Sequence, residues 1–593
     1  MLETKHLSCD LCVVGGGLSG MAAAISAARE GLQVVLMHER AVLGGNASSE
    51  IRMWISGARG DSNRETGLIE EIILENHFRN PTKSYPVWDT VLYDFVRREQ
   101  NIRLLLNCTC MDADAEEGTF PHGRTRRIRS VTGYQMTTQQ FYTVEAKFFA
   151  DCSGDSILAP LTGADFRIGR EAADEFGESL DHVQADNKTM GMSCLIQGRE
   201  TANPIPYYPH DWSAKLQDKD FEDRMPNLYD DAENFWYLEL GGDCDSIHDT
   251  EEIRDDLLAL ATGTWDYIKR NSKFNAQNWD LDFLGFLPGK RESRRMVGEY
   301  ILTQKDVSGG VVFPDEIAFG GWPLDDHFPG GFYHRGTPNT DIATPAPYSI
   351  PYRTLYSANV SNLFFAGRNI SVSHLALSSV RVMATCALLG EAVGKAAYLA
   401  VVNNCTPHGV YEQHLEKLQD LLLNADCFLP SRCRKVSQAC AAATLSGADD
   451  SIRSGIDRPH PIYGDEKQVQ QCDPGQAITY RFDAAEVESI HLVFDSDLNR
   501  KTLPGSWVEQ ARCMRSNQRL DHPQTALPTT LCKEFELAGY LAGEKTFCLH
   551  VKDNRKRSYH IKAGQAFDKL VLTPLQSWGS EKIPVISFDF FNA

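Results

Sequence analysis

The chain has 593 residues, enough for several domains, and its 42% hydrophobic and 23% charged residues are ordinary for a folded protein. A formal net charge of −21 excludes the basic surface that nucleic-acid binding requires, so we expect no nucleic-acid partner. The first ten residues lack the apolar run of a signal peptide, and the 16 scattered cysteines suit a reducing compartment. We therefore expect a cytoplasmic protein.

The first predicted unit, residues 8–40, has the pattern strand, glycine turn, helix, strand and acid. Gly15, Gly17 and Gly20 form a GxGxxG motif directly after an apolar strand, and Glu39 ends the second strand. In such a motif the first glycine permits a tight turn, the second lets the backbone approach a pyrophosphate, and the third lets the helix pack on the strand. The acid accepts hydrogen bonds from ribose hydroxyls. The unit therefore predicts a dinucleotide site at a helix N-terminus.

Helical and strand-like segments alternate after this unit. They are a loop and helix from Asn46 to about Asn80, a helix over 89–99, a strand over 102–110, and a meander of strands that ends in a glycine turn at Gly154. The segment 186–350 is rich in Trp, Pro, Asp and His and predicts an inserted α+β substrate or cap domain. A strand and glycine turn over 359–371 and a small-residue helix over 378–402 then return to the nucleotide domain. Charged residues interrupt that helix, so we interpret it as buried and expect no membrane partner.

Short alternating runs from residue 429 onward, spaced by turn residues, are typical of an all-β sandwich. The predicted fold is thus a Rossmann-type α/β domain with an inserted cap and a C-terminal jelly-roll-like sandwich. Its predicted segments are 1–185 and 351–428 for the nucleotide domain, 186–350 for the cap, and 429–593 for the sandwich.

The glycine motif alone does not separate FAD from NAD, but three later features favour FAD. Glycines follow Glu39 in "RAVLGGNASSEIRMWISGA" and suit a loop along the pyrophosphate and flavin. Gly154 follows a strand and offers a second approach to the nucleotide. Gly367 and Arg368 end a late strand, before a helix that starts near Arg381 and whose N-terminus would face the flavin N1/O2 edge.

These segments resemble FAD-dependent oxidoreductases of the glutathione-reductase-like type, and more narrowly a large bacterial family of FAD-dependent oxidoreductases. Fumarate reductase flavoproteins are more distantly similar. The resemblance covers about residues 8–402 and includes "GGNASSEIRMWISGA", "DCSGDSILA", "RESRRMVGEYILT" and "NLFFAGRNISVSHLALSSVRVMATCALLGEAVGKAA". It implies FAD and a backbone contact to the adenine near Cys110. Motifs and resemblance together predict FAD contacts at Gly15, Gly17, Leu18, Ser19, Gly20, Glu39, Arg40, Gly45, Asn46, Ala47, Ser48, Arg52, Cys110, Ser153, Gly154, Gly367, Arg368, Arg381 and Val382.

Candidates for proton transfer and substrate binding lie in three further segments. His374 lies between the late glycine turn and the predicted helix and is a candidate base, with helix capping as the alternative role. Arg291 and Arg295, with Arg294, are candidates for clamping a substrate carboxylate, although Glu292 and Glu299 offer internal ion pairs. Trp54 either packs beside the flavin or belongs to the core.

The loop "DDHFPGGFYHRG" is a candidate lid that would bring His327 and His334 to the pocket. Asp325, Asp326 and His327 could together form a metal site, but solvated loop charge is the favoured interpretation, and no metal is expected. The C-terminal runs resemble galactose-binding-like jelly rolls, in which loop aromatics stack on sugars, so Trp507 and Trp578 are candidates there. A structural or oligomer-forming domain is the favoured alternative, and a homo-oligomer is one expected state.

Three functions follow from these expectations. The first is an FAD-dependent oxidoreductase that transfers hydride from a CH–OH group of a carbohydrate-like small molecule to flavin N5. The second is a flavin-dependent reductase of a C=C bond in an unsaturated carboxylate, with the arginines binding the acid. The third is a carbohydrate-binding protein with a vestigial flavin. No sequence feature names the electron acceptor, and no second complete GxGxxG motif indicates a nicotinamide site.

Overall fold

The computed structural model describes residues 2–179, 184–230, 233–459, 468–500, 514, 517 and 524–592. The chain divides into two compact units. Unit 1 comprises Met1–Arg59, Thr82–Leu418 and Ala511–Pro523, and unit 2 comprises Gly60–Pro81, Gln419–Gln510 and Gln524–Ala593. The boundaries predicted at residues 185, 350 and 428 remain predictions.

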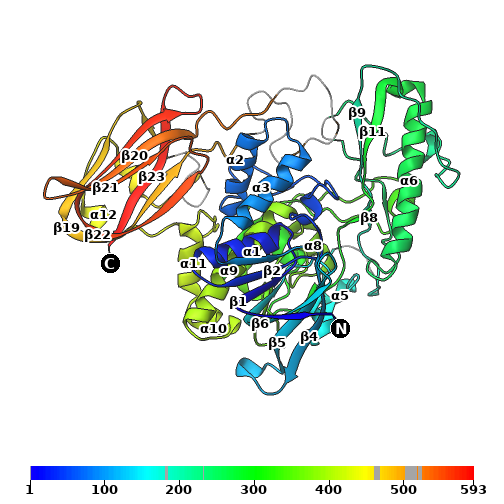
Figure 1. Cartoon of the computed structure of the whole chain (residues 1–593), viewed down its shortest axis with the longest axis horizontal. Coiled ribbons are helices and arrows are strands. Elements are labelled where there is room, and N and C mark those ends of the chain that lie inside the picture. The colour runs from blue at the N-terminus through cyan, green and yellow to red at the C-terminus, as the bar shows by residue number, and fades with distance from the viewer. Residues whose placement is uncertain are drawn as a thin grey trace. The chain divides into compact units, whose positions relative to one another are not determined.

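A mixed sheet in the order β3-β2-β1-β6-β5-β4 forms the centre of unit 1, and β16 pairs with the C-terminal part of β6 (Figure 1). β1, β2, β3, β6 and β16 run parallel, whereas β4 and β5 continue from β6 as an antiparallel meander. The strands are β1 (Thr4–Val14), β2 (Val34–Met37), β3 (Ile102–Leu105), β4 (Cys108–Glu117), β5 (Arg126–Gln135), β6 (Gln140–Asp151) and β16 (Leu363–Phe365).

The register of three parallel strands brings the predicted glycine turns together. Val14 of β1 is opposite Asp151 of β6, and Asp151 is opposite Phe365 of β16. The three strands therefore end at one edge of the sheet, where ligands bind in open α/β folds. Segments far apart in sequence meet there because the sheet aligns the ends of their strands.

Two predicted elements differ from the structure in an instructive way. The strand expected over 102–110 is two strands, β3 and β4, because the backbone at Asn107 turns to a φ of 53°. β3 pairs with β2, and β4 pairs with β5, so this turn moves the chain from one side of the sheet to the other. The helix expected over 89–99 is α3 (Tyr85–Arg97), which begins earlier with a proline in its first turn.

Two helices pack tightly over the sheet near the glycine turn. α1 (Leu18–Arg29) lies against α9 (Met383–Val402), and a Cβ added at Gly390 would lie 2.0 Å from the Ser19 carbonyl oxygen. Small residues are thus needed where the two backbones touch. α9 is the one helix in the described ranges with the length and apolar composition to cross a membrane, and most of that stretch is buried within unit 1. The other helices of this region are α4 (Leu158–Thr162), α8 (His374–Val380) and α10 (Pro407–Gln413).

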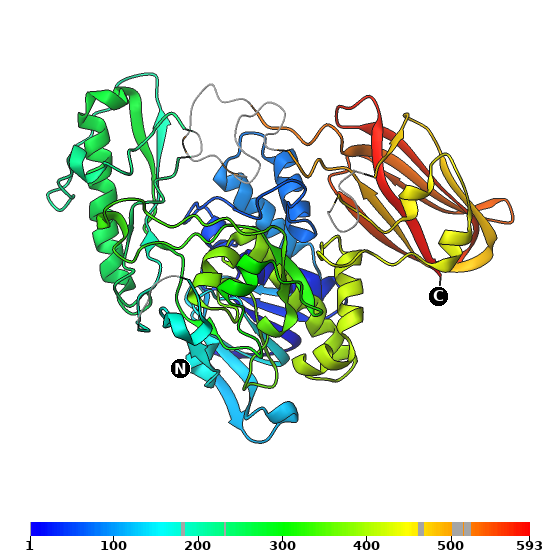
Figure 2. The ribbon, with the colours of Figure 1, turned by 180° about the vertical axis from the view of Figure 1, so that it is seen from behind.

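Short strands and one long amphipathic helix make up the segment predicted as a cap. In Figure 2 the green helix α6 (Thr250–Arg270) runs alongside the strands of this segment. α6 buries Trp265 against Trp279 and Phe235, and this aromatic cluster forms a separate hydrophobic core. The strands are β8 (Met192–Ser193), β9 (Ile196–Glu200), β10 (Glu239–Leu240), β11 (Trp279–Leu284), β12 (Gly289–Lys290), β13 (Arg295–Met296), β14 (Glu316–Gly320) and β15 (Tyr348–Pro351), and a short helix is α7 (Gln304–Gly309). The strand β7 (Phe166–Arg167) and the helix α5 (Ala173–Phe176) precede this segment.

Unit 2 contains an antiparallel β domain of the sandwich type, which confirms the predicted fold class. Its strand order is β18-β23-β19-β22-β20-β21, with β17 on β19. The runs "AITYRF" and "SIHLVFD" join into one strand, β19, because register shifts let it bend without stopping. The elements are β17 (Thr444–Ser446), β18 (Gln470–Cys472), β19 (Ile478–Phe494), β20 (Cys532–Leu541), β21 (Glu544–Val551), β22 (Ser558–Ser577) and β23 (Ile583–Asn592), with α2 (Leu68–Arg79) and α12 (Gln438–Ala442); α11 (Leu415–Asn424) crosses the boundary between the units.

The two aromatic candidates of the β domain have different outcomes. Trp507 lies outside the described residues. Trp578 is half-buried, its Nε1–H donates to the carbonyl of Asn554 at 2.7 Å, and its ring meets Phe78 edge-on at 5.7 Å. These contacts give Trp578 a packing role inside unit 2.

Candidate active site

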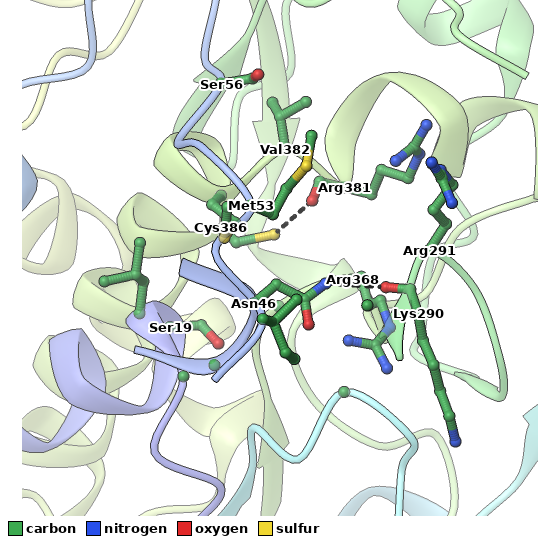
Figure 3. A pocket seen from close by; sticks show the side chains of 18 of the residues that line it. Ser19, Asn46, Met53, Ser56, Lys290, Arg291, Arg368, Arg381, Val382 and Cys386 are labelled. Atoms are coloured by element: carbon green, nitrogen blue, oxygen red, sulfur yellow. Dashed lines mark hydrogen bonds between the residues drawn. The ribbon is translucent and has the colours of Figure 1, made fainter. Parts of the chain in front are cut away.

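A cavity of about 430 Å³ opens at the edge of the unit 1 sheet where β1, β6 and β16 end. Fourteen of the predicted cofactor residues line it: Gly15, Gly17, Leu18, Ser19, Glu39, Arg40, Gly45, Asn46, Ser153, Gly154, Gly367, Arg368, Arg381 and Val382. The glycine turn, the acid after β2, the two later glycine turns and the start of α9 thus share one cavity. Figure 3 shows how Ser19, Asn46, Arg368 and Arg381 converge on it from different segments.

Five predicted cofactor residues do not line the cavity, namely Gly20, Ala47, Ser48, Arg52 and Cys110. The Arg52 guanidinium donates to Gln197 at 2.7 Å and lies over the Phe283 ring, so it joins the cap to the loop after β2. Cys110 is buried in β4, and Ala47 and Ser48 are buried beside the cavity wall. Ala47, Ser48 and Arg52 follow the lining residue Asn46 in the chain, but they do not line the cavity.

Two of the three glycines of the motif are required by the backbone, and the third borders free space. Gly15 has a φ of +106°, which only glycine adopts readily. A Cβ at Gly20 would lie 1.9 Å from the Gly15 carbonyl oxygen, so that position needs a glycine for helix-to-turn packing. Gly17 differs from both, because its backbone is ordinary and a Cβ would meet nothing closer than 3.8 Å. The space beside Gly17 is therefore not filled by other described residues, and it is part of the cavity.

A buried ion network supports the wall beside the second glycine turn. Asp155 accepts from Arg368 at 2.7 Å and from Lys290 at 2.9 Å, and Ser293 donates to it at 2.7 Å. Burial alone would raise the pKa of the Asp155 carboxyl, but the charges of Arg368 and Lys290 lower it to about 2. The Asn46 amide donates to the Lys290 carbonyl at 3.0 Å (Figure 3). This network fixes two cations in the cavity wall, where a phosphate group is best stabilised.

The start of α9 presents a second cation to the cavity. Arg381 precedes the helix, and one of its terminal nitrogens lies 3.1 Å from a carboxylate oxygen of Asp325. Its Nε is buried and has no hydrogen-bond partner within the described residues, and the same is true of Arg368 Nε. Two unpartnered guanidinium nitrogens in one cavity, with the room at Gly17, fit a dinucleotide with a pyrophosphate and a polar ring edge. We conclude that these residues fit FAD.

His327, predicted for a lid, lies in the cavity wall with a buried acid behind it. Its Nδ1 is 2.6 Å from Glu239 Oε2, while its Nε2 is 3.4 Å from Asp325, longer than a normal hydrogen bond. Burial raises the pKa of Glu239, but the charges of Arg291 and His327 outweigh this effect and lower it, so Glu239 is an anion. Nδ1 thus faces Glu239, and Nε2 is the ring nitrogen without a close hydrogen-bond partner among the described residues.

Arg291 also lines the cavity, as predicted for a substrate arginine, but most of its donors are engaged. It donates to Ser193 Oγ at 3.0 Å and to the Trp236 carbonyl at 2.9 Å, and it lies 3.4 Å from Glu239. Arg291 thus organises the cap side of the cavity and supports Glu239. Arg294 is next to it in sequence but turns away, with its guanidinium over the Phe166 ring.

The candidate base His374 does not line the cavity, and the structure gives it another role. It begins α8, fully buried, with Nδ1 2.9 Å from Glu292 and Nε2 3.0 Å from Asp326. Burial alone would lower the pKa of His374, but these two carboxylates raise it to about 10. Both ring nitrogens face carboxylates and neither lines the cavity, so the geometry does not support His374 as the base. The correction is that His374 is the cation of a buried ionic cluster.

Two further catalytic candidates lie outside the cavity lining. Arg295 is buried, forms an ion pair with Glu171 at 3.0 Å, and donates to the carbonyls of Gly169 and Val372. It therefore belongs to the same ionic cluster as His374. His334 stacks on the ring of Phe328 at 4.1 Å on the outer side of the loop. Asp326 turns toward His374, so Asp325, Asp326 and His327 do not converge as metal ligands.

Several cavity residues were missed by the sequence interpretation. Trp236 lies shortly before the two-residue strand β10, which has no detectable periodicity, and Glu239 in that strand supports the lining residue His327 without lining the cavity itself. Lys290 is next to the predicted Arg291, and the strand β12 that positions it is equally short. The other missed lining residues include Gly16, Met53, Ser56, Arg59, Trp322, Asn339, Asp341, Met383 and Cys386, and Trp54, which was left between flavin contact and core, also lines the cavity.

Comparisons with known proteins agree with this geometry. A family model described as FAD dependent oxidoreductase matches residues 10–422. A 4-oxocyclohex-2-ene-1-carboxylate 5-dehydrogenase of Sinomonas cyclohexanicum is 39% identical over 111 residues, which are 17% of this chain and 19% of that protein. The chain thus matches less than a fifth of the length of that relative.

Solved structures match with low similarity. Adenylylsulfate reductase of Archaeoglobus fulgidus is 12% identical over 72% of this chain and 75% of its own, with a TM-score of 0.29. A geranylgeranyl bacteriochlorophyll reductase-like protein of Thermoplasma acidophilum is 11% identical over 71% and 85%, with a TM-score of 0.30. A family 32 carbohydrate-binding module from Streptococcus pneumoniae EndoD is 12% identical over 26% and 100%, with a TM-score of 0.19.

Proposed function

Because the chain belongs to the FAD dependent oxidoreductase family, we propose that it oxidises a CH–OH group of a small carbohydrate-like molecule, with His327 taking the hydroxyl proton. Bound FAD supplies the hydride acceptor for this reaction. The observation that carries the proposal is the position of His327, which lines the cavity while Glu239 holds its Nδ1 at 2.6 Å.

The neighbours of His327 suit a proton acceptor. With Nδ1 held by Glu239, Nε2 is the nitrogen that would take the hydroxyl proton, since its distance of 3.4 Å to Asp325 is longer than a normal hydrogen bond. When Nε2 takes a proton, the imidazolium is flanked by the carboxylates of Glu239 and Asp325, which stabilise its charge. The Trp236 ring meets the His327 ring edge-on at 5.5 Å and limits its rotation.

The cavity lining favours a polar ring as the substrate. The aromatic residues Trp236 and Trp322 line the cavity, with the Arg59 guanidinium over the Trp322 ring at 4.5 Å, and Asn339 and Asp341 add polar groups to the lining. An aromatic surface combined with a few planar polar groups is the arrangement that binds a small polyhydroxy compound. This composition supports a sugar or sugar acid.

The test uses His327→Gln, with His334→Gln from the same loop as the matched control. Both proteins are loaded with FAD, and flavin reduction is followed anaerobically with sugars, sugar acids and hydroxy acids. We expect His327→Gln to bind FAD normally but to be reduced about 10²- to 10⁴-fold more slowly, the usual contribution of a general base. His334→Gln should react like the unaltered protein. Equal reduction rates in His327→Gln and the control would contradict the proposal.

A second candidate is reduction of a C=C bond in an unsaturated carboxylate, and Arg381 favours it. Its buried Nε has no hydrogen-bond partner within the described residues, and it lines the cavity with Arg291. A carboxylate would satisfy this nitrogen. The name of the Sinomonas relative denotes an unsaturated cyclic carboxylate, so that compound belongs in the panel. Reoxidation of the reduced protein by unsaturated acids, with no reduction by any hydroxy compound, would select this alternative.

A further inference from the structure

Two histidines and a glutamate of unit 1 meet on a part of the structure that does not line the cavity. His122 lies in the short turn η2 (Pro121–Gly123) between β4 and β5, and His408 and Glu412 lie on α10. One possible ligand atom from each residue lies within 4.8 Å of the others. His408 Nε2 is 3.1 Å from Glu412 Oε1, and His122 Nδ1 is 3.7 Å from Glu412 Oε2.

Local structure brings the three side chains to one place. His408 and Glu412 are four residues apart on a helix, so they share a face. His122 adopts a φ of 59°, which is uncommon for a residue with a Cβ, and Arg124 donates to the His122 carbonyl at 2.9 Å. The imidazole rings of His122 and His408 are 4.2 Å apart between centroids. The turn is thus held in the conformation that presents His122 to α10.

A half-buried carboxylate orients the second histidine. His408 Nδ1 is 2.6 Å from Glu299 Oε1, and Arg124 and Tyr356 also donate to Glu299. Because Nδ1 is turned to Glu299, the other ring nitrogen, Nε2, lies on the side of Glu412, 3.1 Å from its Oε1.

We propose that His122, His408 and Glu412 bind a divalent transition-metal ion of the zinc type. Two imidazoles and one carboxylate are a ligand set that Zn²⁺ uses, with the fourth position left to water. Mg²⁺ and Ca²⁺ prefer oxygen ligands throughout, so the two histidines disfavour them. The contact between His408 Nδ1 and Glu299 is the carboxylate–histidine arrangement that accompanies metal-bound histidines.

The ion would join two elements that are remote in sequence, the β4–β5 turn and α10. Its site is separate from the cavity lining, so the proposal does not depend on the proposed redox reaction. A surface ion pair between Glu412 and the histidines is the competing explanation. The two explanations differ because an ion pair needs no metal and gives no binding isotherm.

The test is calorimetric titration of Zn²⁺ into the FAD-loaded full chain after removal of metals with a chelator. His122→Ala removes one exposed ligand, and Glu412→Gln keeps the shape of another while removing its charge. His248→Ala is the matched control, since His248 forms an exposed pair with Asp245 at 2.9 Å and belongs to no three-residue cluster in the described part of the chain. Thermal unfolding with and without Zn²⁺ gives a second measurement on the same proteins.

We expect the unaltered chain and His248→Ala to bind one equivalent of Zn²⁺. His122→Ala and Glu412→Gln should bind Zn²⁺ at least about tenfold more weakly, because each lacks one residue of the metal site. Zn²⁺ should raise the melting temperature of the first two proteins and leave that of the ligand variants unchanged. The same stoichiometry and affinity in all four proteins, or no saturable binding in any, would overturn the proposal.

Discussion

Gly17 and Gly20 are separated by one helical turn, yet substitution by alanine should have opposite consequences. At Gly17 the backbone has a φ of −67°, and a Cβ would meet only Gly45 Cα at 3.8 Å. Alanine there costs no strain, and a stability change within about 1 kcal/mol is expected. At Gly20 a Cβ would lie 1.9 Å from the Gly15 carbonyl oxygen, so α1 must move away from the turn. Overpacking of that kind costs about 1–3 kcal/mol or more.

The affinity for FAD should show the opposite order, with the larger direct effect from Gly17→Ala. The new methyl group of Gly17→Ala occupies the side of the cavity where the pyrophosphate is expected, and losing one charge-assisted hydrogen bond costs about 1.5–3 kcal/mol. That energy corresponds to a rise in Kd for FAD of about 10- to 150-fold. The folded apoprotein should otherwise resemble the unaltered protein.

The assay combines thermal unfolding of the apoproteins with a fluorescence titration of FAD. Gly309→Ala is the matched control, because a Cβ there also meets nothing closer than 3.8 Å and lies outside the cavity lining. Unaltered FAD affinity in Gly17→Ala would refute the placement of the pyrophosphate. If apo Gly17→Ala unfolded at the same temperature as Gly20→Ala, the inference that the backbone leaves room for a Cβ at Gly17 would be refuted.

Three further changes test other parts of the account. Replacing His374 with Gln removes the cation between Glu292 and Asp326, leaving Glu292 only its 3.6 Å contact with Arg295, and should cost about 3–5 kcal/mol by denaturant unfolding. The pKa of His374 in the folded protein is raised to about 10, so its contribution to the free energy of unfolding is fully present below pH 6.5 and is lost as the pH rises through 10. Over that pH range the unaltered protein should therefore lose stability more steeply than the variant. Parallel plots of stability against pH for the two proteins would count against this. Glu39→Ala should weaken FAD binding by about 10- to 100-fold in the titration above, through loss of the ribose acceptor, and an unchanged Kd would argue that the ribose lies elsewhere. Trp578→Ala should destabilise the β domain by about 3–5 kcal/mol without changing flavin reduction, and an unaltered melting transition would disprove its packing role.

The sequence was sufficient for the nucleotide half of the cavity because that half is encoded locally. Gly15, Gly17 and Glu39 belong to one strand–helix–strand unit with a fixed period, so their spacing alone indicates where they lie. The two later turns at Gly154 and Gly367 were recognised for the same reason, as glycines directly after apolar strands. The sheet register then brings all three turns to one edge.

The substrate half was not predictable in this way, because its residues come from short strands in the cap. His374 was predicted as a base from its position near the late glycine turn. Its ring nitrogens contact the carboxylates of Glu292 and Asp326, which are far away in sequence. His327 and Glu239 pair across 88 positions, and β10 has only two residues, too few to show a period. The sequence indicated separate short strands where the structure has the long strands β19 and β22, because a bulge bends a strand without ending it.

The most direct measurement is the visible spectrum of the purified, FAD-loaded protein, followed anaerobically while sugars, sugar acids and small hydroxy acids are added in turn. Our account predicts a flavin band that is bleached by at least one of these hydroxy compounds, at a rate that falls in His327→Gln. A flavin band that no hydroxy compound bleaches, in a protein whose reduced form is reoxidised by an unsaturated carboxylate, would contradict it.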